Sequence, residues 1–313
     1  MKYDAENRIA EIVAGAEEFK APVMPSASSI KPRLHVESCN PHLTVAALRD
    51  IFAREGTLYD RGVPVRLTAD RRLDCVVAHP LTPDSVVLLA HSVCRPYAMR
   101  SNKDDTPKSV DARLPRSIAV MYLDWVREWQ LPLLQGIAST PLLRDDGSIY
   151  SAPGYDKATG FWLENVPDIA PLIPVRPTAA DAERALRCLR DTFATFCFAD
   201  AQTTRVPDID TELVDTNSKP GADESAFLTA LLTAASRPSL TLAPGVLIRA
   251  APLSGAGSGK GLLARCISLI AFGREPTAFT SGGNAQELEK RLAAELMAGG
   301  PVLVLDNLNN MAF

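Results

Sequence analysis

The sequence lacks long apolar runs and any recognisable secretion signal. No stretch of its 313 residues reaches the roughly 18 consecutive apolar residues of a membrane-spanning helix. The N-terminus, MKYDAENRIAEIVAG, places acidic residues where a signal peptide needs an apolar core. We therefore expect a cytoplasmic protein without a membrane partner.

Basic residues are not in excess. The chain has 33 Lys and Arg against 37 Asp and Glu, which gives a formal net charge of −4. Nucleic-acid-binding proteins usually carry a basic footprint. Bulk composition thus gives DNA binding no support, although one small basic loop would be enough to hold DNA. The apolar fraction of 46% is that of an ordinary globular protein.

Cysteine is sparse and shows no CxxC pair, which argues against a zinc ribbon or a secreted disulfide scaffold. Cys75, His79, His91 and Cys94 are close enough in sequence to be considered as zinc ligands. Their spacing matches no familiar ligand framework, and Cys75 and His79 lie in a strand-like apolar run. We interpret all four as structural residues.

The length suggests about two domains of roughly 100–200 residues each. Residues 1–40 are rich in Pro and Ser towards their end and predict a mobile leader. Residues 41–238 predict a mixed α+β domain. Residues 239–313 predict an α/β segment whose sequence pattern differs from that of residues 41–238.

Local patterns predict the elements of these parts. We expect helices over 43–54, 82–93, 117–129, 178–196 and 223–235. We expect two short strands within 57–67, around Asp60-Arg61-Gly62, one strand over 73–78 and a small antiparallel sheet over 131–163. The polar stretch 100–116 predicts an exposed loop, and residues 200–222 are polar and contain proline. Thr82 and Thr178 are the expected N-caps of two of these helices. Trp125 and Trp129, four residues apart, are expected in the core.

The C-terminal segment carries the pattern of a phosphate-binding loop. From Pro244 the chain reads PGVLIRAAPLSGAGSGKGLLARCISLIAFG, which predicts a strand, a glycine-rich loop and a helix. Such a loop turns backbone N–H groups towards one anion at a helix N-terminus. The predicted ATP-binding residues are Ser254, Gly255, Ala256, Gly257, Ser258, Gly259, Lys260 and Gly261.

Two positions depart from the pattern GxxxxGK[ST]. Ser254 replaces the first glycine, which is a mild change because a small residue can start the turn. Gly261 replaces the Ser or Thr whose hydroxyl normally binds Mg²⁺. The metal would have to rely on water, on an acid elsewhere or on Ser258.

A second motif lies at a suitable distance. The run PVLVLDN, residues 301–307, predicts a buried strand that delivers Asp306 to the Mg²⁺ shell. Asn307 occupies the place where many P-loop ATPases have a catalytic Glu. An amide orients water but cannot take its proton, so nucleotide binding is better supported than hydrolysis.

The segments GSGKGLLAR, SGGNAQELEKRLAAELMAGG and PVLVLDNLNN together resemble the ATPase region of phage and integrated-element replicative helicases of superfamily 3. In that family GKG also replaces GK[ST], and the Walker B strand also ends in Asp-Asn. The resemblance implies that Lys260 binds the β- and γ-phosphates, that Asp306 binds Mg²⁺, and that the full-length protein forms a homo-oligomeric ring on DNA.

The sequence stops directly after the second motif, so we expect an incomplete P-loop core: the N-terminal portion of a helicase-type ATPase with little turnover by itself. Two alternatives stay open. One is a nucleotide-binding or interaction protein that does not hydrolyse ATP. The other is a primase-like or DNA-binding accessory role carried by residues 43–240.

Overall fold

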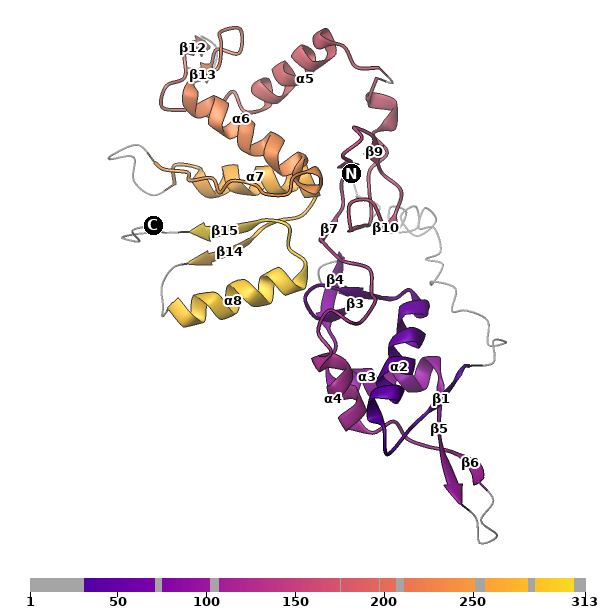
Figure 1. Ribbon diagram of the computed structural model, residues 1–313. Helices are drawn as coiled ribbons and strands as arrows, with labels where there is room; N and C mark the ends of the chain where they lie inside the picture. The colour runs from indigo at the N-terminus through magenta and orange to yellow at the C-terminus, as the bar shows by residue number, and fades with distance from the viewer. Residues whose placement is uncertain are drawn as a thin grey trace, which may run out of the picture.

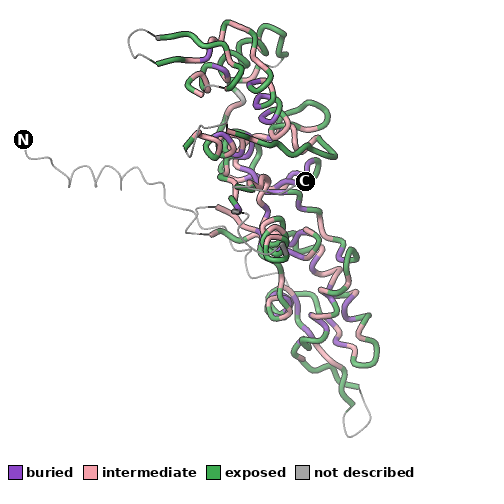
Figure 2. Tube along the Cα trace, turned by 90° about the vertical axis from the view of Figure 1, so that its left-hand side faces the viewer, coloured by how far each residue is buried: buried purple, intermediate pink, exposed green. Residues whose placement is uncertain are grey.

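The computed structural model shows a chain of helices and small sheets (Figure 1). It describes residues 31–70, 75–101, 107–174, 176–196, 198–206, 211–250, 257–280 and 285–306. The buried residues form several clusters spread along an elongated molecule (Figure 2). The expected mixed α/β content is confirmed. No helix in the described ranges is long and apolar enough to cross a membrane.

The N-terminal elements are three helices and two three-stranded sheets. They are β1 (Arg33–His35), α2 (Pro41–Glu55), β2 (Leu58–Asp60), β3 (Pro64–Asp70), β4 (Cys75–Pro80), α3 (Pro83–Val93), β5 (Arg95–Ser101), β6 (Pro107–Asp111) and α4 (Arg116–Asp124). The sheet β2-β3-β4 is antiparallel. In the sheet β1-β5-β6, β1 runs parallel to β5 and β6 antiparallel to it.

Local capping explains where α3 begins. The Thr82 hydroxyl accepts a hydrogen bond from the Ser85 backbone N–H at 3.2 Å, and the Ser85 hydroxyl accepts one from the Thr82 N–H at 2.7 Å. This reciprocal pair satisfies two backbone donors that the first turn leaves without helical partners. The predicted N-cap at Thr82 is confirmed.

Trp129 lies in the core of this region, as expected. Its side chain is 1% exposed, and its Nε1 donates to the Tyr122 carbonyl at 2.7 Å. The ring of Phe52 meets Tyr122 edge-on at 5.3 Å. The helix predicted over 117–129 is shorter than expected, since α4 ends at Asp124 and Arg127 then takes a left-handed φ of 66°.

Two predictions for this region were wrong. The polar stretch 100–116 was expected to be a loop, but most of its described residues belong to the β5–β6 hairpin and to the start of α4. The leader predicted over 1–40 lies mostly outside the described residues. Its last part is ordered structure, because β1 pairs with β5 and buries Leu34 completely.

The central elements are short strands followed by two helices. They are β7 (Gly136–Ala138), β8 (Leu142–Leu143), β9 (Ile149–Tyr150), β10 (Gly154–Asp156), β11 (Phe161–Leu163), α5 (Ala179–Thr192), β12 (Thr203–Val206), β13 (Thr211–Val214) and α6 (Ala222–Ala235), with 3-10 turns at Ala170–Leu172 and Arg237–Ser239. The small sheet was expected to be antiparallel. It is mixed instead, because β11 pairs antiparallel with β10 and parallel with β7.

The last described elements are α7 (Lys260–Phe272), β14 (Thr277–Thr280), α8 (Ala285–Ala298) and β15 (Leu303–Asp306). The strand predicted after Pro244 does not form: residues 242–250 have no strand pairing within the described ranges, and Leu247 is 67% exposed. Ala271 and Phe272 of α7 share a core cluster with Phe161 and Leu163 of β11, so apolar packing crosses the expected boundary at residue 238.

Candidate nucleotide-binding site

The glycine-rich loop enters α7 through two left-handed residues. Gly257 has a φ of 92° and Gly259, the N-cap of α7, has a φ of 82°. Only glycine adopts such values readily. Ser254, Gly255 and Ala256, three of the predicted ATP-binding residues, lie outside the described residues. The described half of the loop has the backbone that a turn into an anion-binding helix N-terminus needs.

Lys260 is the first residue of α7. Its Nζ lies 3.0 Å from the hydroxyl oxygen of Ser258 and donates a hydrogen bond to it. The N-cap of this helix, Gly259, has no side chain, and no side-chain cap is formed among the described residues. Its first backbone N–H groups and the positive end of its dipole are therefore available to an anion together with the ammonium group of Lys260.

The loop rests on an aromatic cluster formed by Phe193, Phe196, Phe198 and Phe227. Phe193 and Phe227 meet at 4.7 Å between ring centroids, and Phe196 and Phe198 at 5.0 Å. Leu263 of α7 is 4% exposed and packs into the same cluster. The connection after α5 thus packs against the first turns of α7, next to the glycine-rich loop.

Asp306 ends β15, as predicted, but the strand is not buried as expected: none of its four residues is buried, and Leu305 is 38% exposed. β14 and β15 are parallel, with Thr280 paired to Asp306, and α8 connects them, which makes a βαβ unit. Figure 1 shows the start of α7 and the arrowheads of β14 and β15 on the same, left-hand side of the ribbon. Asp306 is exposed there. Asn307, the other predicted catalytic residue, lies outside the described residues.

The opposite ends of these elements are anchored to the N-terminal part of the chain. The carbonyls of Ala271 and Phe272, in the last turn of α7, accept hydrogen bonds from Thr140 Oγ1 at 2.7 Å and the Ser139 N–H at 2.8 Å. The Leu296 carbonyl, near the end of α8, accepts from Arg61 Nε at 2.5 Å. These donors satisfy carbonyls that a helix C-terminus leaves unpaired.

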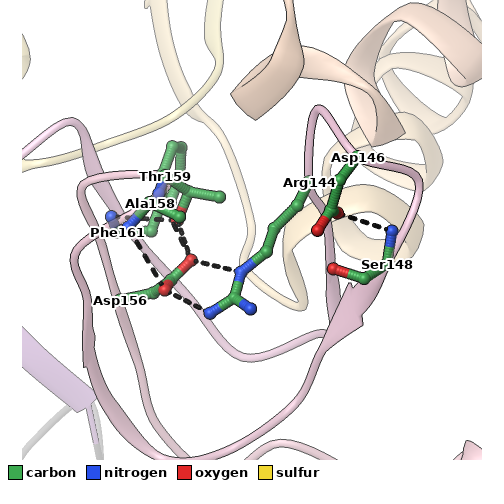
Figure 3. Close-up of polar contacts among 7 residues, drawn as sticks. All are labelled: Arg144, Asp146, Ser148, Asp156, Ala158, Thr159 and Phe161. Atoms are coloured by element: carbon green, nitrogen blue, oxygen red, sulfur yellow. Dashed lines mark hydrogen bonds and ion pairs between the residues drawn. The ribbon is translucent and has the colours of Figure 1, made fainter.

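An ion pair between the half-buried Arg144 and the buried Asp156 stabilises the neighbouring sheet (Figure 3). The Asp156 carboxylate, 4% exposed, accepts from Arg144 Nη2 at 2.5 Å and from Thr159 Oγ1 at 2.8 Å. Burial acts to raise the pKa of Asp156, but the hydrogen bonds from Arg144, Thr159 and the Ala158 N–H outweigh it and hold the pKa below its ordinary value. Every partner is a local protein group, so we assign the cluster a structural role.

The four Cys and His residues considered as zinc ligands do not form a metal site in the described structure. Cys94 Sγ donates to the Ala90 carbonyl at 3.0 Å, and His91 Nε2 accepts from the Leu114 N–H at 3.2 Å. Cys75 and His79 lie on β4. Within the described residues, no group of three or more Cys, His, Asp or Glu is placed to hold a metal ion.

Phe196 was not among the predicted site residues. A Cβ atom on Gly259 would lie only 2.9 Å from its Cε2 atom, so Phe196 borders the glycine-rich loop directly. The available signal was the aromatic run around residues 193–198. Periodicity places this run at a helix end but does not indicate which segment it contacts.

No protein-family model, curated protein or solved structure matches the chain.

Proposed function

We propose that this chain binds ATP with Mg²⁺ at the start of α7. The observation that carries the proposal is the left-handed pair Gly257 and Gly259 leading into an uncapped helix whose first residue is Lys260. In this proposal the loop N–H groups and Lys260 hold the phosphates. Asp306 reaches the Mg²⁺ shell through water.

The Mg²⁺ shell would differ from that of most P-loop proteins. Gly261 supplies no hydroxyl, and the hydroxyl of Ser258 accepts a hydrogen bond from Lys260. We therefore expect the ion to be held by phosphate oxygens, water and Asp306. This arrangement supports binding of Mg-ATP more directly than it supports turnover.

We propose further that the nucleotide site belongs to an ATPase of the phage or mobile-element replicative helicase type, with DNA and a homo-oligomeric ring as the partners of the full-length protein. The described βαβ unit of β14, α8 and β15 supports this proposal, since it places an acid at the end of the second strand. The remaining support is the sequence resemblance. A nucleotide-binding protein without hydrolysis is the second candidate, favoured by the glycine at position 261.

The test is equilibrium binding of a fluorescent ATP analogue to the whole chain, with unlabelled ATP as competitor. Lys260→Ala should weaken binding at least tenfold. Lys290→Ala removes the same charge from the exposed face of α8 and should leave the affinity unchanged. Equal affinity of wild type and Lys260→Ala would contradict the proposal. Phosphate release measured on the same samples separates an ATPase from the non-hydrolysing alternative.

A further inference from the structure

The sheet β1-β5-β6 and the residues that follow it concentrate positive charge in an acidic protein. Residues 31–36, 95–101 and 107–116 contain seven Lys and Arg against one Asp, whereas the whole chain has a formal net charge of −4. The seven, all exposed, are Lys31, Arg33, Arg95, Arg100, Lys108, Arg113 and Arg116. We call this surface the basic sheet. Such local concentration produces a positive potential that attracts polyanions.

Strand register brings three of these arginines together. Arg33 of β1 and Arg95 of β5 are directly paired across the parallel ladder. Beyond the end of β6, the Ala112 N–H still donates to the Pro96 carbonyl at 3.0 Å. The next residue, Arg113, therefore follows beside Arg95. Like charges on adjacent strands destabilise a sheet, so this row costs the fold stability unless an anion neutralises it.

Most of the basic sheet has no carboxylate partner. Within the described residues, Arg95, Arg100, Lys108 and Arg113 form no ion pair and no side-chain hydrogen bond, whereas Arg116 pairs with Asp84 at 3.2 Å. Two less exposed arginines behave differently: the half-buried Arg144 pairs with Asp156, and the buried Arg190 pairs with Glu224. Arg95 and Arg113 lie on the same face of the sheet as Arg33, whereas Arg100 and Lys108 lie on the other face, because side chains alternate along a strand.

The same sheet presents planar groups. The Arg33 guanidinium lies 4.0 Å from the centre of the Tyr97 ring, and His35 stacks on that ring at 5.1 Å. The exposed large apolar side chains of its described strands are Met99 and Val110. A membrane-docking surface needs a broad apolar face beside its cations, and two isolated side chains do not make one. Planar cations next to an aromatic ring are typical of nucleic-acid contacts.

We infer that the basic sheet binds the phosphate backbone of nucleic acid. Figure 1 shows the β5–β6 hairpin projecting from the lower end of the molecule, remote from α7 and β15. The inference is therefore independent of nucleotide binding. Arg33, Arg95 and Arg113 contact phosphates in a row on one face of the sheet.

The experiment measures fluorescence anisotropy of labelled DNA of about 20 nucleotides, longer than the roughly 4–16 nucleotides of common single-strand sites. Single-stranded and duplex forms are titrated with the whole chain over a range of salt concentrations. The test variant is Arg95→Gln/Arg113→Gln. The matched control is Arg54→Gln/Arg66→Gln, which removes two exposed arginines from α2 and β3. Circular dichroism checks that both variants are folded.

The expected result is salt-dependent binding to at least one DNA form and a loss of about tenfold or more in the test variant only. For a single strand, the slope of log K against log salt should fall by about 1.4, since each phosphate contact contributes about 0.7. Lys260→Ala should bind DNA like wild type. The inference is overturned if neither DNA form binds at low salt, if both double variants lose affinity equally, or if the chain binds phosphatidylserine vesicles but no DNA.

Discussion

The ring of Phe196 closes the space beside Gly259, because a Cβ atom there would lie 2.9 Å from Phe196 Cε2. Gly259 also has a left-handed φ of 82° and directly precedes Lys260. Conformation and packing thus both require glycine at this position. The arrangement joins the proposed phosphate loop to the connection after α5, two segments about sixty residues apart in sequence.

Gly259→Ala should destabilise the protein by about 2 kcal/mol or more, since it combines a left-handed alanine with overpacking. Gly261→Ala is the matched control: it lies inside α7, and a Cβ there meets nothing within 4 Å. This control should stabilise by roughly 0.5–1 kcal/mol through helix propensity. Urea denaturation measures both. A Gly259→Ala protein as stable as wild type would show that Phe196 does not constrain the loop.

Asp306→Asn should remove the dependence of ATP affinity on Mg²⁺, because a neutral amide no longer attracts the hydrated ion. Binding without Mg²⁺ should change little, since the loop and Lys260 contact the phosphates directly. Glu287→Gln, on the exposed start of α8, is the control. The measurement is a titration with ATP in the presence of Mg²⁺ and in the presence of a chelator. A Mg²⁺ response that survives Asp306→Asn would remove this residue from the proposed site.

Glu224→Ala should destabilise the fold by about 3–5 kcal/mol, because it leaves a buried cation without its partner. Arg190 donates to both carboxylate oxygens of Glu224, from Nε at 2.6 Å and from Nη2 at 3.0 Å, and the two side chains are only 6% and 4% exposed. Glu287→Ala breaks an exposed pair with Arg291 and should cost no more than about 0.5 kcal/mol. Similar losses in the two variants, measured by denaturant unfolding, would contradict the assignment.

Alkaline pH should destabilise the protein partly through Cys94. Burial raises the pKa of this thiol from 9.0 to about 11, against a smaller opposing effect of Lys31. The folded state therefore holds the proton more tightly, so stability is full below pH 9 and falls as the pH rises towards 11. Cys94→Ala should remove this part of the decrease in the free energy of unfolding at alkaline pH. Unfolding curves at neutral pH and near pH 10.5 test it; an identical pH slope in both proteins would exclude the contribution.

Sequence signals succeeded where a few neighbouring residues determine the structure. Thr178 accepts from the Asp181 N–H, and the Asp181 carboxylate accepts from the Thr178 N–H, as the capping pattern predicts. The glycines before Lys260 likewise adopt the left-handed values that the loop pattern requires. Helix starts and the backbone conformation of the described half of the glycine-rich loop could therefore be predicted from local chemistry.

Features that depend on distant partners could not be predicted in this way. The pairing of Leu34 with Pro96 joins residues about sixty positions apart, so periodicity gave no indication of β1. The apolar run around Leu247 is typical of a buried strand, yet it stays exposed because it has no strand partner among the described residues. The net charge of the whole chain also gave no indication of the basic sheet, since acidic residues elsewhere outweigh Arg33, Arg95 and Arg113.

The most direct test of nucleotide binding at α7 is calorimetric titration of a non-hydrolysable ATP analogue with Mg²⁺ into wild type and Lys260→Ala. Wild type should bind one equivalent. Lys260→Ala should lose at least tenfold in affinity while its free energy of unfolding stays within about 0.5 kcal/mol of wild type, because the Lys260 side chain is only half-buried. Absence of heat with wild type, or equal affinity in the two proteins, would contradict the assignment of this loop as an ATP site.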